Sequence, residues 1–201
     1  MPRVSRQQTE KNRAAIEEAS ARLIREQGIK GVSVADLMAA AGLTHGGFYG
    51  HFESKDALAA AACAKAFALS LERWRERTAR AGDAAAALRF IVEAYLSRRA
   101  RDDAGNSCPA ASLAVDVARE PSDRPVRQSY VEGIHGLVDS LAALRDSGDE
   151  AADRERALVE LSLMVGALLM ARATAADPIS DQILDAARRH LLPEDGSLPT
   201  P

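Results

Sequence analysis

Apolar residues recur at helical spacing along almost the whole chain, and no segment shows the alternation of apolar and polar residues that is typical of a strand. Alanine, leucine and arginine are abundant while aromatic residues are scarce, and the abundant types lose little conformational freedom in a helix. One early apolar stripe consists of Ile16, Ala19, Leu23 and Ile24. The sequence therefore predicts an all-α protein of about nine helices.

Capping residues and glycines predict where these helices begin and end. Gly28 should end the first helix, and Ser33 forms with Asp36 a pair like a capping box that starts a second helix, which Gly42 ends. Thr44 is placed to cap a third helix. The later helices are predicted over residues 44–51, 54–80, 83–96, 108–119, 124–146, 152–176 and 178–192, with a loop at 102–107.

The composition changes near residue 55. Before this point three short helices follow one another closely, whereas the later helices are long and strongly apolar. This change predicts a small head, residues 1–55, on a larger body, residues 56–193, with a disordered tail at 194–201.

Positive charge is concentrated at the start of the chain, although the formal net charge of the whole chain is −3. Residues 1–13 contain Arg3, Arg6, Lys11 and Arg13 against the single acid Glu10. A basic arm on an acidic body is typical of a protein that contacts phosphate with one end only. The alternative is an ordinary charged terminus.

Several classes of function find no support in the sequence. The two cysteines, Cys63 and Cys108, lack the spacing of a zinc or redox motif, and the four histidines form no HExxH pattern. No pair of catalytic groups is evident, so we expect no enzyme activity, metal or cofactor. The longest apolar run, residues 161–171, is too short to span a bilayer, and no signal peptide is recognisable. We therefore expect a cytoplasmic protein without a membrane partner.

The most informative stretch is residues 32–58, VSVADLMAAAGLTHGGFYGHFESKDAL. Two short helices joined by a tight glycine turn at Gly42 have helix-turn-helix spacing. Small residues at 39–41 permit close contact between the helices, while Phe48 and Phe52 are expected to face inward. The outward side of the second helix then consists of Thr44, His45, Gly47, Tyr49 and His51.

This stretch resembles the DNA-binding domain of the tetracycline-repressor-like (TetR/AcrR) family. The resemblance covers about residues 10–60 and rests on Ser33, on the segment Ala39-Ala40-Ala41-Gly42, on Tyr49-Gly50-His51-Phe52 and on Ser54-Lys55-Asp56-Ala57-Leu58. Outside it, Ser107-Cys108-Pro109-Ala110-Ala111 is similar to the start of the sixth helix in one branch of the family. The resemblance implies a homodimer that binds a double-stranded DNA operator and responds to a small-molecule effector.

The resemblance also implies roles for single residues. Ser33, Thr44, Tyr49 and Lys55 match positions that contact the phosphate backbone, and hydroxyl groups at helix starts are suited to that contact. His45 and Gly47 match positions near base edges, and His51 matches a position that reaches either. Tyr49 could instead be an ordinary half-buried tyrosine, and His51 could cap the helix.

The recognition helix departs from the family in its glycines. Gly46, Gly47 and Gly50 each cost about 1 kcal/mol relative to alanine in a helix interior, and they leave few side chains that can reach bases. Specificity should then depend on His45, on the basic arm and on DNA shape.

The last two predicted helices are apolar enough to form either a central core or a dimer interface. The family implies a four-helix bundle with a second copy, and most homo-oligomers are two-fold. The residues predicted at this interface are Leu161, Met164, Val165, Leu168, Ile183, Leu184 and Ala187.

Aromatic and polar residues of the body could line a ligand cavity or belong to a plain core. The candidates are Phe67, Phe90, Trp74, Tyr95, Tyr130 and His135. Cys108 lies at a predicted helix start, where a thiol pKa can be lowered, although a structural role is the simpler interpretation. The sequence thus predicts a ligand-responsive repressor that a small molecule releases from a palindrome-like operator. The alternatives are a thiol-sensing regulator that uses Cys108, and an all-helical enzyme.

Overall fold

A computed structural model describes residues 6–192, and within this range the regular elements are all helices, with no strand. The all-α class is thereby confirmed, while Arg3 and the tail predicted at 194–201 lie outside the described residues. The elements are α1 (Arg6–Gln27), α2 (Val34–Ala40), η1 (His45–Gly50), α3 (Lys55–Thr78), α4 (Ala84–Tyr95), α5 (Arg98–Asp102), η2 (Ala104–Asn106), α6 (Pro109–Arg119), α7 (Pro125–Ala142), α8 (Glu150–Ala173) and α9 (Ile179–Leu191).

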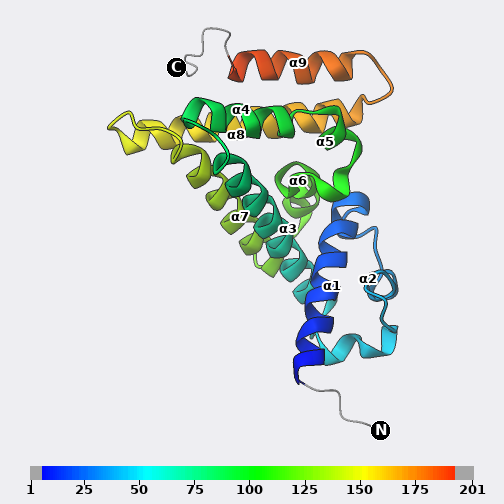
Figure 1. The fold of residues 1–201 in the computed structure, drawn as a ribbon. Helices are drawn as coiled ribbons and strands as arrows, with labels where there is room; N and C mark the ends of the chain where they lie inside the picture. Colours follow the sequence, from blue (N-terminus) through cyan, green and yellow to red (C-terminus); the bar gives the residue numbers. More distant parts are fainter. Residues whose placement is uncertain (1–5, 193–201) are drawn as a thin grey trace.

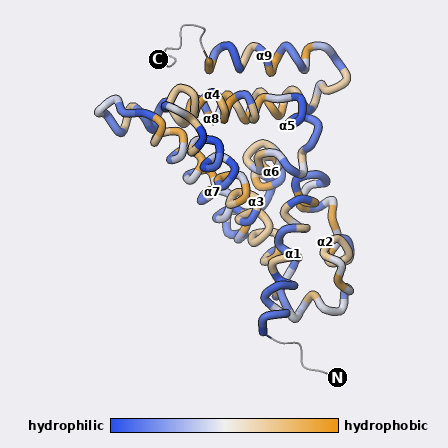
Figure 2. Tube along the Cα trace, viewed as in Figure 1, coloured by the Kyte–Doolittle hydropathy of each residue, from blue (hydrophilic) through white to orange (hydrophobic). Residues whose placement is uncertain are grey.

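The helices form a head at one end and a larger body that extends away from it (Figure 1). Helices α1 and α2 and the 3-10 helix η1 make the head, and α3 leads from it into the body, where it packs along α7. Helix α8 packs on α7, and α9 lies against α8 at the end of the body opposite η1. Hydrophobic and hydrophilic residues alternate along the helices (Figure 2).

Most helix ends lie where the capping residues predicted them. Gly28 and Gly42 have φ of +80° and +71°, the left-handed conformation that glycine adopts with least strain. Ser33 and Asp36 form the predicted capping box at α2. Ser54 and Asp83 accept hydrogen bonds from backbone N–H groups at the starts of α3 and α4, and Pro109 begins α6.

Other predicted boundaries differ from the structure. The loop predicted at 102–107 contains the end of α5 and the 3-10 turn η2, because Ser97 and Asp103 cap local turns there. Helix α7 ends at Ala142, four residues before the predicted end. Pro178 takes the N-cap position of α9 in place of the predicted first helical position, so α9 begins one residue later, at Ile179. Helix α8 occupies 150–173 in place of the predicted 152–176, because Asp149 caps its start.

The core runs without interruption from the head into the body. It includes Ile16 and Ile24 of α1, Phe48 of η1, and Leu58 and Phe67 of α3. Helix α7 approaches α3 closely at Gly133, where an added Cβ would come within 2.2 Å of the Phe67 ring. No helix within residues 6–192 has both the length and the apolar character needed to cross a membrane.

Candidate DNA-binding surface and ligand cavity

The second helix of the motif is a six-residue 3-10 helix, η1, in place of the predicted α-helix of about two turns. Its three glycines explain the difference, since they disfavour a regular α-helix. Phe48 holds η1 to the head, because its side chain is only 1% exposed and its ring stacks on Phe52 with centroids 6.2 Å apart. Both phenylalanines therefore face inward, as the sequence predicts.

The outer side of η1 is open to solvent. Tyr49 is 76% exposed although it is a large aromatic residue, and its ring touches only the edge of Phe48 among the ring contacts of the described chain. Thr44, His45 and Gly47 are also exposed. Tyr49 is thus not the half-buried core tyrosine of the alternative interpretation, and its ring and hydroxyl are presented outward.

Three other predicted DNA contacts lie at the starts of elements around η1. Thr44 precedes η1, but its side chain makes no capping hydrogen bond, so the predicted cap is wrong and the hydroxyl is not used there. Lys55 is the first residue of α3 and half-buried. The Ser33 hydroxyl donates to Asp36 Oδ2 at 2.6 Å, so a phosphate contact by this group has to compete with the capping box.

His51 occupies the C-cap of η1, and its backbone N–H donates to the Phe48 carbonyl. Its Nδ1 atom is buried without a hydrogen-bond partner in the described chain. Arg13 fixes this end of η1, because its Nη1 donates to the His51 carbonyl at 2.6 Å and its guanidinium lies 4.3 Å from the centre of the Phe52 ring. Arg13, which the sequence assigns to the basic arm, therefore also positions the recognition segment.

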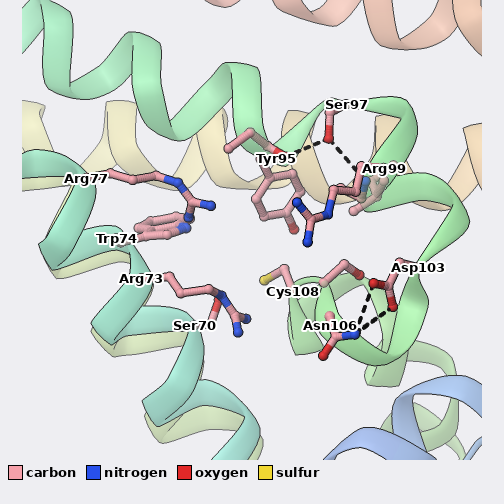
Figure 3. Close-up of a pocket in the computed structure, with 14 residues that line it drawn as sticks. Ser70, Arg73, Trp74, Arg77, Tyr95, Ser97, Arg99, Asp103, Asn106 and Cys108 are labelled. Atoms are coloured by element: carbon pink, nitrogen blue, oxygen red, sulfur yellow. Dashed lines mark hydrogen bonds between the residues drawn. The ribbon is translucent and has the colours of Figure 1, made fainter.

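A cavity of about 440 Å³ lies in the body, between α3 on one side and α4, α5, η2 and the start of α6 on the other (Figure 3). Trp74 and Tyr95, two of the predicted ligand-binding residues, line it, with ring centroids 6.4 Å apart at an interplanar angle of 66°. The other lining residues are Ser70, Arg73, Arg77, Ala94, Ser97, Arg99, Ala100, Asp103, Asn106, Ser107, Cys108 and Leu168.

The remaining predicted ligand residues do not line this cavity. Phe67 and Tyr130 pack edge-to-face with centroids 5.5 Å apart, and the Tyr130 hydroxyl donates to the Ala110 carbonyl at 2.8 Å, so both belong to the core beside it. His135 is exposed on α7 and contacts Arg154 of α8. Phe90 is exposed on α4.

The arginines of the cavity wall are not among the residues that the sequence pattern singles out. Arg73 and Arg77 are four residues apart on α3 on either side of Trp74, and Arg99 comes from α5. The sequence nevertheless contains one indication of these arginines. Like charges at i and i+4, as at Arg73 and Arg77, repel on a helix and usually need a compensating partner. Only the fold brings Arg99 opposite them.

Cys108 lies in the cavity wall at the N-cap of α6 and is buried. Burial raises the pKa of its thiol, although Tyr95 and Ser70 and the first N–H groups of α6 act in the opposite direction. Desolvation therefore outweighs the helix N-terminus, which agrees with the simpler, structural interpretation of Cys108. Cys63 is also buried, and burial raises its pKa to about 12.

One buried arginine joins the head to the cavity wall. Arg25 of α1 donates to the Ala21 carbonyl at 2.7 Å and to the Ser107 carbonyl at 2.8 Å. Burial lowers the pKa of Arg25 to about 10. Ser107 is also held by Arg172 of α8, which donates to its hydroxyl, so this cavity residue links α1 to α8. A second link is the Ile29 N–H, which donates to Asp116 of α6 at 2.9 Å.

The residues predicted at the dimer interface lie mostly inside the protomer. Val165 and Ile183 are half-buried, and the others are buried in its own core: Leu161, Met164, Leu168, Leu184 and Ala187. Helix α8 exposes a different apolar stripe, which includes Leu158, Val159, Leu169 and Met170. Helical periodicity revealed two apolar faces of α8 without indicating which one meets the protomer's own core.

Comparisons with known proteins agree with this architecture. The model of the family described as bacterial regulatory proteins, tetR family, matches residues 16–62. A TetR transcriptional regulator from Chloroflexus aurantiacus is 24% identical, with a TM-score of 0.75 over 92% of this chain and 94% of that one. The reduced form of NemR from Escherichia coli is 20% identical, with a TM-score of 0.75 over 90% and 95%.

A third solved structure is a FadR regulator from Bacillus subtilis in complex with stearoyl-CoA, which is 16% identical with a TM-score of 0.63 over 90% of this chain and 97% of that one. No curated protein sequence matches the chain. The matched segment contains α2, η1 and the start of α3, and the fold likeness extends over the body. The chain therefore has an N-terminal segment, residues 16–62, that matches the tetR family of bacterial regulatory proteins, and an all-α fold like that of solved TetR transcriptional regulators.

Proposed function

We propose that the protein is a homodimeric repressor that a small molecule releases from a palindrome-like operator. The observation that carries this proposal is the buried hydrogen bond from Arg25 of α1 to the carbonyl of Ser107 in the cavity wall. It connects the helix that positions η1 with the cavity in which an effector would bind. Residues 1–55 would then read DNA, and residues 56–193 would bind the effector and the second copy.

On the DNA side, the hydroxyls of Thr44 and Tyr49 and the ammonium group of Lys55 would contact phosphates, while Ser33 would contribute after exchanging its bond to Asp36. His45 is the exposed side chain of η1 best able to reach a base edge, because Gly47 contributes only backbone. His51 would position η1 mainly through its backbone carbonyl, which accepts a hydrogen bond from Arg13. Exposure of Thr44, His45 and Tyr49 at η1 supports the assignment.

On the effector side, a molecule in the cavity would displace Ser107 or its neighbours Asn106 and Cys108. Because Arg25 and Arg172 both bind Ser107, that displacement would shift α1 relative to α8 and change the spacing of two heads in a dimer. A ligand that favours the wrongly spaced state lowers operator affinity by a population shift.

We further propose that the second copy docks on the exposed stripe of α8 and on the start of α9. Leu158, Val159, Leu169 and Met170 repeat on one face of α8, and Ile179 continues the apolar surface. Gly166 lies within this face, with open space beside it that would let a second helix approach closely. The stripe is far from η1, so two copies joined there leave both heads free (Figure 1).

The regulatory proposal is tested by mapping the genomic DNA fragments that the full chain protects. We expect a site with two half-sites about one helical turn or a multiple of it apart, as for other dimeric helix-turn-helix proteins. Protection of a single, unrepeated half-site, or no protection at all, would contradict the proposal.

The interface is tested by Val159→Glu, with Phe90→Glu on α4 as a matched control. Both substitutions place a carboxylate at an exposed apolar position, but only Val159 lies on the proposed stripe. Sedimentation should give monomers for Val159→Glu and dimers for the control. A folded Val159→Glu protein that still sediments as a dimer would exclude this face.

A thiol-sensing regulator is the second candidate, because Cys108 lies in the cavity wall beside Ser107. The raised pKa of its buried thiol argues against rapid oxidation. Operator affinity before and after mild peroxide separates the two candidates. Release of the parent protein but not of Cys108→Ser would favour the thiol sensor.

A further inference from the structure

Three guanidinium groups face the cavity without an ion-pair partner in the described chain. Arg73 and Arg77 project from α3 and Arg99 from α5 toward the same space (Figure 3). None of the three forms an ion pair or a side-chain hydrogen bond with any residue between 6 and 192. Their neighbours differ, since Arg98 and Arg101 of α5 both pair with Asp181, at 2.6 and 3.0 Å. These two arginines of α5 are neutralised by Asp181, and the three that face the cavity have no such ion pair in the described chain.

The surroundings add positive charge behind these groups. Arg25 and Arg172 lie behind the wall and donate only to carbonyl and hydroxyl oxygens, so neither is paired with a carboxylate within the described chain. Burial and the nearby charge of Arg77 lower the pKa of Arg73. Such mutual repulsion in a partly desolvated cavity favours the binding of an anion.

The single acid of the wall does not cancel this charge. Asp103 accepts hydrogen bonds from the Asn106 side-chain amide at 3.0 Å and from the Asn106 backbone N–H. These bonds lower its pKa and direct the carboxylate into the η2 turn. It therefore acts as a local cap and forms no ion pair with the three arginines.

We propose that the effector is an anion, with a carboxylate or phosphate group bound by Arg73, Arg77 and Arg99 and an apolar part packed on Trp74. Guanidinium groups bind both kinds of anion through paired N–H donors. Trp74, Tyr95 and Leu168 supply an apolar wall on which a ring or chain can rest. This inference rests on the proposed function, because it assigns a chemical class to the effector of the same cavity.

The cavity carries its own reporter, because Trp74 is the only tryptophan of the chain. We would titrate the full chain with 4-phenylbutyrate, 4-phenylbutyl phosphate and the uncharged 4-phenylbutyramide, and with inorganic phosphate, and follow tryptophan fluorescence. The two organic anions should bind at least about tenfold more tightly than the amide, as expected for hydrogen bonds to charged groups. The tighter of the two anions identifies the carboxylate or the phosphate ester as the natural headgroup.

Arg77→Gln and Arg99→Gln should each weaken binding of the organic anions about tenfold and leave the amide unchanged. Arg75→Gln is the matched control, because Arg75 is on α3 between the cavity arginines but points to solvent and pairs with Glu72. It should bind all probes as the parent does. Arg77→Lys, which keeps the charge, should recover part of the lost affinity.

Equal binding of the amide and the anions overturns the inference. It is also overturned if Arg75→Gln loses as much affinity for the organic anions as Arg77→Gln and Arg99→Gln do. Failure of all the anions to bind up to their solubility limits also overturns it. Operator affinity measured on the same samples separates this inference from the regulatory proposal. If DNA binding is intact but anions do not bind, only the inference fails. If anions bind but no DNA is protected, the regulatory proposal fails and the anion site stands.

Discussion

The head and the body of this protein present their polar groups in opposite ways. In the head, Tyr49 and His45 point outward from a short element that is anchored by Phe48. In the body, Arg73, Arg77 and Arg99 point inward to a cavity. Neither set forms side-chain hydrogen bonds or ion pairs within residues 6–192. Groups without such internal partners are available to a ligand, and their direction distinguishes the proposed DNA surface from the proposed effector cavity.

The two regions share a continuous core, and one of the polar contacts between them is made by a buried arginine. Arg25 belongs to the head by sequence, yet its guanidinium binds Ser107 of the body. The comparison therefore predicts that substitutions in the head change operator binding and substitutions in the body change ligand binding or stability. Arg25, which links the two regions, is the exception.

The largest effect is expected from Phe48→Ala. Removing this buried ring should cost roughly 3–5 kcal/mol in the free energy of unfolding and should abolish operator binding, because η1 loses its anchor. Trp74 fluorescence of the native protein should stay unchanged, since Trp74 lies in the body. Phe90→Ala, at an exposed aromatic residue, is the control and should change the free energy of unfolding by about 0.5 kcal/mol or less. Retention of operator binding by Phe48→Ala would contradict the anchoring role.

Arg25→Met tests this link. It keeps most of the side-chain volume but removes two hydrogen bonds, so we expect a loss of about 1.5–3 kcal/mol in unfolding free energy. Operator binding should survive, but ligands that occupy the cavity should no longer change it. Arg22→Met on the same helix removes an exposed ion pair with Glu26 and should cost about 1 kcal/mol at most. The proposed coupling through Arg25 is contradicted if the operator affinity of Arg25→Met responds to cavity ligands as that of the parent does.

The same substitution in each region sharpens the comparison. Tyr49→Phe should weaken operator binding about fivefold for all sequences, because phosphate contacts carry no base information, and should leave stability unchanged. Tyr130→Phe should lower stability and leave operator binding unchanged. It removes the hydrogen bond to the Ala110 carbonyl, and its position in the body does not contact DNA. Thermal unfolding and operator titrations of both variants measure these effects. A loss of stability in Tyr49→Phe together with a loss of operator affinity in Tyr130→Phe would contradict the separate roles of head and body.

Lys55→Ala should reduce the slope of operator affinity against salt concentration by about one unit, since one phosphate contact is lost. Operator titrations over a range of salt concentrations measure this slope. An unchanged slope would mean that the start of α3 does not touch the DNA backbone.

The smallest effect is expected at the thiols of the body. Burial raises the pKa of Cys108, and that of Cys63 to about 12, so at pH 8 almost no thiolate is present. A thiol reagent should therefore react slowly with the native protein and rapidly after denaturation, and the native rate should increase with pH. Cys108→Ser should change operator affinity by about twofold at most. Fast native reaction at pH 7 would reopen the thiol-sensor alternative.

By itself the sequence determined the helical class, most helix ends and the inward anchors of the head. These depend on local physics, because Ser33, Gly28 and Gly42 act on the backbone within a few residues of themselves. The predicted DNA-contact set also lies within one stretch of 23 residues, from Ser33 to Lys55, so the prediction needs only a contiguous motif.

Only the tertiary structure decided the body's site and faces. The cavity is built from α3, α4, α5, η2, α6 and α8, and nothing local to Arg99 indicates that it faces Arg73 and Arg77. Which apolar face of α8 meets the protomer's own core likewise depends on where α7 and α9 pack. The direction of the pKa shift of Cys108 was decided by the tertiary structure for the same reason, because neighbours distant in sequence bury the thiol and desolvation outweighs the local helix start.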